Sequence, residues 1–207
     1  MNVGIITSYI IAGIILVSML MMNNRVSNSS AELTLTQITR EKVATITQMI
    51  YDDIPNMGYD LYNPTSQIII SADSSTIKFY RKIDRHTPGN PELITWQLTD
   101  APVSVTKNPA DKILLRKVEK DGVEEVTEIK LGVTRFQIWY FDEHGLSTLP
   151  EDGEFLSTPV SAALRDSIKQ LYFAIELQSA EPIYTGGNAR YIRSAWEKRF
   201  SPSNLDK

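Results

Sequence analysis

The chain opens with a long run of apolar residues, and its hydrophobic pattern changes twice after that run. Residues 3–22 carry no charge, and about 20 apolar residues in a helix cross the hydrocarbon core of a bilayer. The pattern therefore predicts three segments. Residues 1–25 form a transmembrane anchor, residues 26–58 an amphipathic helix that continues the anchor, and residues 59–207 a β-sheet domain.

The apolar run has two other interpretations. A cleaved signal peptide needs basic residues before its apolar core and a small-residue cleavage site after it, but no Lys or Arg precedes this run and the sequence NNRV follows it. A buried helix of a soluble protein is rarely apolar on every face at a terminus, because one side meets water. The anchor is the better interpretation of the three.

The second segment has an apolar stripe at helical spacing. Leu35, Ile38, Val43, Ile46 and Ile50 recur with polar residues between them. We expect these five side chains to pack against the sheet. The helix is expected to end at the IPNMG sequence of residues 54–58, because a residue before proline disfavours the helical region. The Asn and Ser residues within 23–30 compete for backbone hydrogen bonds, so any interruption between the anchor and the amphipathic helix would be expected there.

After residue 58 the hydrophobic period becomes two, which is typical of strands. Short turns separate the candidate strands, and Asp121-Gly122 is the strongest hairpin signal. The fold class that follows is α+β, with a long N-terminal α-helix, transmembrane in its first half and amphipathic in its second half, packed on a largely antiparallel β-sheet. The expected strands are residues 67–71, 76–81, 93–99, 112–120, 123–131, 133–142 and 167–179.

The amino-acid composition excludes several classes of function. The net charge is −4 and the isoelectric point is near 5.3, so nucleic acid is not an expected partner. The chain has no cysteine, which excludes disulfides, thiol catalysis and zinc-thiolate sites. The segment 190–199 is locally basic and contains two aromatic residues. It is expected to be solvated or docked on its own domain, with contact to a phosphate surface as the less favoured alternative.

Candidate catalytic chemistry is sparse. His86 and His144 stand alone beside turns, without the spacing of a metal site. Acidic pairs, among them Asp52-Asp53 and Glu151-Asp152, could ligate calcium if folded together, but none shows the alternating oxygen ligands of an EF-hand. Gly186-Gly187 is better interpreted as a flexible turn than as a phosphate cradle. We expect no enzyme activity, metal, cofactor or small-molecule substrate.

Six short motifs occur in a specific order. They are DDIPNMGY at 52–59, SSTIKFY at 74–80, ITWQL at 94–98, LLRK at 114–117, VTRFQIWYFD at 133–142 and IKQLYFAI at 168–175. In this order, over roughly residues 30–180, the chain resembles the minor type IV pilins of the W type and the J-type minor pseudopilins of type II secretion. Pilins also carry a basic leader, a cleavage glycine and a glutamate five residues later. Here no basic leader is present, and Tyr9 is the fifth residue after Gly4.

The resemblance implies a structural subunit in the cytoplasmic (inner) membrane, single-pass, with the C-terminal domain extracytoplasmic. It outweighs Arg25, which by the positive-inside rule weakly favours a cytoplasmic domain. The expected partners are other pilin-like subunits, bound through the N-terminal helix by close packing at Ala12 and Gly13, in assembly or tip initiation of a type IV pilus or a type II secretion pseudopilus. With no recognisable prepilin cleavage motif, we expect an unprocessed N-terminus or an upstream start.

The main alternative is a membrane-tethered extracytoplasmic binding or sensory domain unrelated to filaments. Its ligand surface would be residues 184–196 or a face of the sheet. A membrane-anchored hydrolase is a third and weaker alternative, because no catalytic set is apparent in the sequence.

Overall fold

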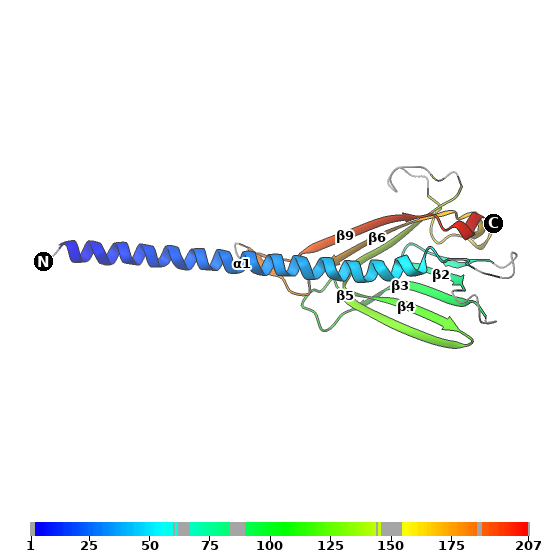
Figure 1. The fold of residues 1–207 in the computed structure, drawn as a ribbon, viewed down its shortest axis with the longest axis horizontal. Helices are drawn as coiled ribbons and strands as arrows, with labels where there is room; N and C mark the ends of the chain where they lie inside the picture. The colour runs from blue at the N-terminus through cyan, green and yellow to red at the C-terminus, as the bar shows by residue number, and fades with distance from the viewer. Residues whose placement is uncertain are drawn as a thin grey trace.

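The computed structural model describes residues 3–59, 61, 67–82, 90–143, 145, 155–185 and 188–206. His86, His144, Glu151-Asp152 and Gly186-Gly187 lie outside the described residues. One long helix and a curved sheet make up the molecule, and the sheet covers only the C-terminal half of the helix (Figure 1).

Helix α1 (Val3–Asp53) is unbroken, and at 1.5 Å per residue it is about 75 Å long. The Asn and Ser residues within 23–30 do not interrupt it, since no Gly or Pro occurs between Gly13 and Pro55. Its many threonines are accommodated because their hydroxyls donate to carbonyl oxygens one turn earlier instead of competing for the helix's N–H groups. Such bonds are made by Thr34, Thr36, Thr39 and Thr45.

The main sheet has seven strands, all paired antiparallel, in the order β1-β2-β3-β4-β5-β6-β9. A separate hairpin is formed by β7 and β8. The strands are β1 (Ile69–Ala72), β2 (Thr76–Arg81), β3 (Glu92–Pro102), β4 (Lys112–Lys120), β5 (Val123–Phe141), β6 (Gln170–Gln178), β7 (Ile183–Thr185), β8 (Asn188–Arg190) and β9 (Arg193–Phe200). Two short 3-10 helices, η2 (Ala162–Ser167) and η3 (Ser203–Asp206), complete the described elements. The α+β class is therefore confirmed.

Strand β5 differs from the prediction, which divided it into residues 123–131 and 133–142. It is one strand of 19 residues that bends at Gly132, where φ is 96°. Its pairing with β4 shifts register there, between Lys112 and Leu114. A glycine at this position lets the strand bend sharply while its ladder continues on both sides.

Replacing Gly132 with alanine is expected to lower the free energy of unfolding by about 3 kcal/mol, from backbone strain and overpacking. A Cβ atom built there lies 2.3 Å from the backbone oxygen of Gln178. Gly122 is the matched control, because its φ is also positive, 80°, but its Cβ would meet nothing within 4 Å. Gly122→Ala should cost about 1 kcal/mol. Equal losses in chemical denaturation would show that the close approach to β6 is unimportant.

Three strands were not predicted. Strand β9 comes from the segment interpreted as a basic tail, and β7 and β8 from a segment interpreted as a loop. β9 lies at the edge of the sheet beside β6, and its arginines and lysine are typical of an edge strand, whose outer side faces water. Only Trp196 and Phe200 turn toward the core, too few to produce a clear alternation.

The core lies between the C-terminal half of α1 and the sheet. The helix contacts β9 and β6 of the main sheet and lies across one face of that sheet (Figure 1). Aromatic rings fill the centre, with Trp96 stacked on Phe136 at 6.3 Å and Phe136 packed on Phe173 at 5.9 Å between ring centroids. An apolar sheet face needs a cover, and α1 provides it.

Candidate functional site

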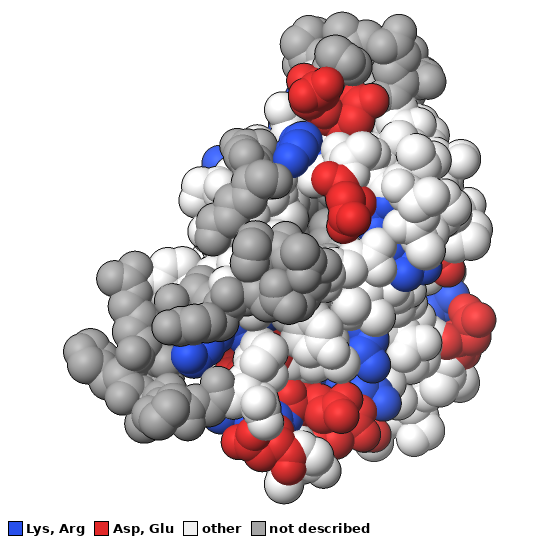
Figure 2. Space-filling view, turned by 90° about the vertical axis from the view of Figure 1, so that its right-hand side faces the viewer, with Lys and Arg blue, Asp and Glu red and all other residues white. Residues whose placement is uncertain are grey.

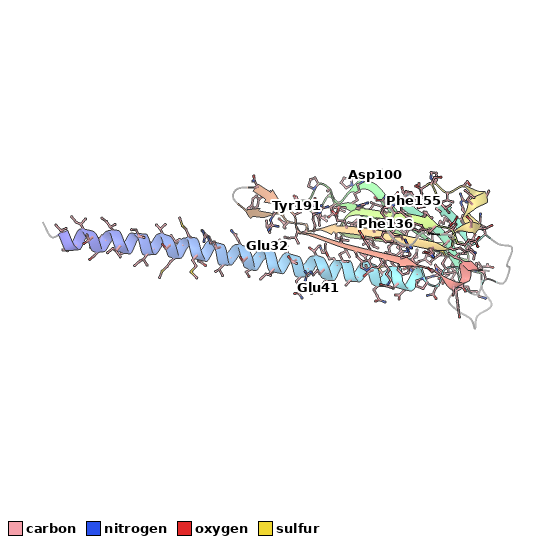
Figure 3. The ribbon with its side chains drawn as sticks, turned by 90° about the horizontal axis from the view of Figure 1, so that it is seen from above. Glu32, Glu41, Asp100, Phe136, Phe155 and Tyr191 are labelled. Carbon is pink, nitrogen blue, oxygen red and sulfur yellow. The ribbon has the colours of Figure 1, made fainter. Side chains whose placement is uncertain are left out.

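The N-terminal part of α1 projects beyond the sheet domain. Every described side chain from Val3 to Ala31 is exposed, and the bare helix extends away from the domain in Figure 3. Large apolar side chains such as Ile10, Ile14 and Leu16 are more than half exposed. By length and composition this helix could cross a membrane. A single apolar surface of this size on a protein marks a site of contact with lipid or with other proteins.

Three hydroxyl side chains of this segment are bonded to the backbone of the helix itself. Thr7 donates to the carbonyl oxygen of Val3 at 3.0 Å, Ser8 to that of Gly4 at 2.8 Å, and Ser18 to that of Ile14 at 2.9 Å. Hydroxyl groups are tolerated in hydrocarbon when they bond to the backbone in this way. The segment therefore presents no unsatisfied hydroxyl donor to a bilayer at these three positions.

The small residues of the helix lie in open space. Ala12 is exposed, and a Cβ atom built on Gly13 or on Gly4 meets nothing within 4 Å. Ala12 also lines a shallow depression together with Gly4 and Ser8, at the four-residue spacing that lets helix backbones approach each other. Ala12 and Gly13 were the predicted packing residues, whereas the spacing of Gly4, Ser8 and Ala12, although visible in the sequence, was not predicted.

The five residues expected to face the sheet do not all do so. Val43, Ile46 and Ile50 belong to the core cluster, and Leu35 is half-buried. Ile38 is 41% exposed, whereas its neighbour Thr39 is 1% exposed. The helical phase places Thr39 toward the domain, and its hydroxyl is satisfied by the carbonyl of Leu35 at 2.7 Å.

A buried charged cluster around Asp53, called the joint below, connects the end of the helix to the sheet. Asp53 is the last residue of α1, and its side chain is fully buried. Arg81 of β2 donates to Asp53 Oδ1, and Arg116 of β4 makes a bidentate contact of 2.7 and 2.8 Å. Trp96 of β3 donates its indole N–H to Oδ2 at 2.8 Å. One carboxylate thus ties α1 to three adjacent strands.

A second carboxylate extends this joint. Glu92 accepts from Arg81 Nε at 3.2 Å and from Lys120 Nζ at 3.4 Å. Hydrogen bonding to Asp53 raises the pKa of Arg116. A buried carboxylate is retained at low cost only when its oxygens are saturated with donors, and here both oxygens are. The joint fixes the position of the sheet domain relative to the projecting helix.

Asp111, directly before β4, contrasts with this joint. Both of its carboxylate oxygens are buried and without a hydrogen-bond partner, as for no other side chain in the described part of the protein. Burial raises the pKa of Asp111, and the nearby Thr106, Lys42 and Gly132 offset this effect only in part. A buried carboxyl with a raised pKa is more stable in its protonated form.

The Asp111→Asn variant is therefore expected to gain stability relative to the parent chain as the pH rises. For a folded-state pKa above the unfolded value of about 3.9, the contribution of Asp111 to stability is full below that value and is lost as the pH rises through the folded pKa. Asparagine does not titrate. Urea denaturation of both proteins from about pH 3 to pH 7 measures the difference, and a difference that is constant across this range would contradict the account.

Other titratable groups suggest no catalytic centre in the described segments. No cluster of three or more His, Cys, Asp or Glu side chains that could hold a metal ion occurs among the described residues. Asp52 and Asp53 differ in burial, since Asp52 is exposed and Asp53 is buried, so the two carboxylates do not face a common site. At the end of the domain far from the helix N-terminus, acidic and basic side chains are interspersed (Figure 2).

Comparisons with known proteins identify the fold. No protein-family model matches the chain, and no curated protein matches it. Among solved structures, a type IV-like pilin from Thermus thermophilus is similar, with a TM-score of 0.51 and 12% sequence identity, over 81% of this chain and 98% of that one. At this identity the likeness shows the fold alone. The fold of this chain is therefore pilin-like.

Proposed function

We propose that the chain is a membrane-anchored structural subunit, a minor pilin of the W type or a J-type minor pseudopilin, that takes part in assembly or tip initiation of a type IV pilus or a type II secretion pseudopilus. The pilin-like fold supports this proposal, and so do the motifs common to these subunits. The proposed function is structural and not catalytic. The helix holds the subunit among its partners, and the sheet domain is fixed on that helix.

The observation that carries the proposal is the bare apolar helix. Its uncharged part, residues 3–22, is long enough to cross the hydrocarbon core. In a bilayer, lipid covers this surface first, and neighbouring helices replace lipid where small residues let backbones come close. The sheet domain lies outside the cytoplasm in this proposal, and the anchor lies in the cytoplasmic membrane.

Topology is the first test. Protease added to spheroplasts is expected to digest the sheet domain, while the protein stays in the membrane fraction. A domain that is protected until the cells are lysed would place it in the cytoplasm and would exclude a role in a filament outside.

Gly13→Leu is expected to weaken the recovery of pilin-like partners from native membranes, and with it pilus formation or secretion, by about tenfold, which corresponds to about 1.4 kcal/mol of helix packing. The added side chain clashes with nothing in the subunit itself, because the space beside Gly13 is open. Membrane insertion should be unchanged.

Ile14→Leu is the control, because it keeps the side-chain volume on the adjacent position of the helix. It should leave recovery at the level of the parent chain. If the two variants behave alike, close packing at Gly13 has no role. If no pilin-like protein is recovered even with the parent chain, a tethered binding or sensory domain becomes the better interpretation.

A further inference from the structure

The domain forms a groove against α1 at the end nearest the bare helix. Its volume is about 500 Å³, and Asn28, Glu32, Leu35, Pro182, Ile183 and Tyr184 are among its lining residues. The β7–β8 hairpin forms the wall opposite the helix, and Arg190 of β8 is paired with Glu32 of α1 at 2.6 Å. Figure 3 places Glu32 on the helix below this end of the domain, with Tyr191 close by. The pair lies where the hairpin meets the helix, and β7 itself also contacts α1.

The groove is close to the membrane surface. The apolar run ends at Met22. Asn28, the lining residue of the groove that is nearest the N-terminus, follows Met22 by six residues, or about 9 Å along a helix. The headgroup layer on each side of the hydrocarbon core is about 5–8 Å thick. The groove therefore begins within a few ångströms of the outer edge of the headgroup layer.

The side chains at this end suit a headgroup layer. Tyr184 is 65% exposed, and tyrosine concentrates at membrane interfaces because its ring is apolar and its hydroxyl polar. Val105 of the neighbouring loop is 83% exposed. Lys107 and Arg190 are also exposed, and each is bound to a single exposed carboxylate, at 2.8 and 2.6 Å. Such exposed pairs are weak, so lipid phosphates can compete for these cations.

We infer that this end of the domain, centred on Tyr184 and the loop containing Val105, rests on the phospholipid headgroups of the membrane that holds the helix. The inference builds on the proposed anchoring. It assigns the surface a lipid partner, which sets the height and tilt of the domain before the subunit joins other subunits.

The absence of cysteine from the chain allows single fluorescent labels on the full-length protein in phosphatidylcholine–phosphatidylglycerol vesicles. The test positions are Tyr184→Cys and Val105→Cys, each labelled with an environment-sensitive dye. Val123→Cys, at the β4–β5 turn at the opposite end of the sheet and 71% exposed, is the matched control. Ala12→Cys reports insertion of the helix. Quenchers are lipids with a nitroxide on the headgroup or on the acyl chain.

Headgroup nitroxide is expected to quench the dyes at positions 184 and 105 at least about twofold more than the dye at 123. The β7–β8 hairpin and the β3–β4 loop lie at the end of the domain nearest the bare helix, and the β4–β5 turn lies at the opposite end (Figure 1). The effect should persist when the protein is diluted to about one copy per vesicle. Quenching at 184 and 105 no stronger than at 123 would overturn the inference, and so would quenching that disappears on dilution, because a second protein would then occupy the groove.

The label at position 12 separates this inference from the proposed function. Strong quenching there by acyl-chain nitroxide, together with weak quenching at 184 and 105, would leave the anchor in place and reject the headgroup contact. Weak quenching at 12 would reject the anchor itself, and the headgroup contact with it.

Discussion

Asp53→Ala is expected to lower the free energy of unfolding by about 5 kcal/mol, the upper end of the range for breaking a buried ion pair. The substitution removes the carboxylate bound by Arg116 and leaves Arg81, whose side chain is only 6% exposed, with Glu92 as its remaining carboxylate. It also leaves the buried indole N–H of Trp96 without its acceptor. Chemical denaturation of the full chain in detergent micelles measures the loss.

Asp52→Ala is the matched control. Asp52 precedes Asp53 directly, has the same charge, and is exposed, with a single side-chain contact from Gln48 at 3.2 Å. Its loss should cost less than about 1 kcal/mol, as for most surface positions. Comparable losses in the two variants would mean that the joint between helix and sheet contributes little. The helix dipole cannot account for a loss, because it disfavours an acidic residue in the last turn.

Ile46→Asp is expected to lower the free energy of unfolding by about 4 kcal/mol or more, because it places an unpaired charge in an apolar core. Ile46 has no exposed surface and lies in the core cluster under the helix. The variant is expected to remain in the membrane fraction, since residues 3–22 are unchanged, but its domain should be digested rapidly by protease.

Ile38→Asp tests the same helix at an exposed position. Ile38 is 41% exposed, so its replacement should cost less than about 1 kcal/mol. A loss at Ile38 as large as at Ile46 would show that the stripe faces the sheet along its whole length, as the sequence pattern suggested, and that the helix is rotated relative to the arrangement described above.

The regular elements were predictable because their signals are local. The predicted bounds of β2 and β4 match the structure. β2 has a clear alternation of buried and less buried positions, and β4 ends at the turn of Asp121-Gly122. Strand β5 was divided in two because a glycine inside an alternating pattern usually marks an end, whereas Gly132 bends the strand and its pairing continues. Strand β9 was missed because an edge strand carries its charges outward and shows little alternation.

The joint at Asp53 could not be predicted, because it depends on partners that the fold brings together. Arg81 and Arg116 lie 28 and 63 residues further along the chain, and the sequence shows only an acidic pair at the end of a helix. The orientation of the helix was likewise visible only approximately. The apolar residues from Leu35 to Ile50 are compatible with either of two neighbouring faces of the helix turning toward the sheet. In the packed structure Thr39 faces the domain and Ile38 is exposed.

Cross-linking from within the membrane tests the central claim most directly. Ala12→Cys gives the chain a single thiol on the surface proposed to meet other helices. A maleimide that carries a photoreactive diazirine, attached to this thiol, captures the neighbouring protein in native membranes on illumination. We expect adducts with proteins that have an apolar N-terminal helix and a pilin-like domain, and their loss in the Gly13→Leu background. Adducts only with unrelated membrane proteins, or none when Ala12→Cys is inserted and expressed at the normal level, would contradict the assignment as a pilin-like subunit.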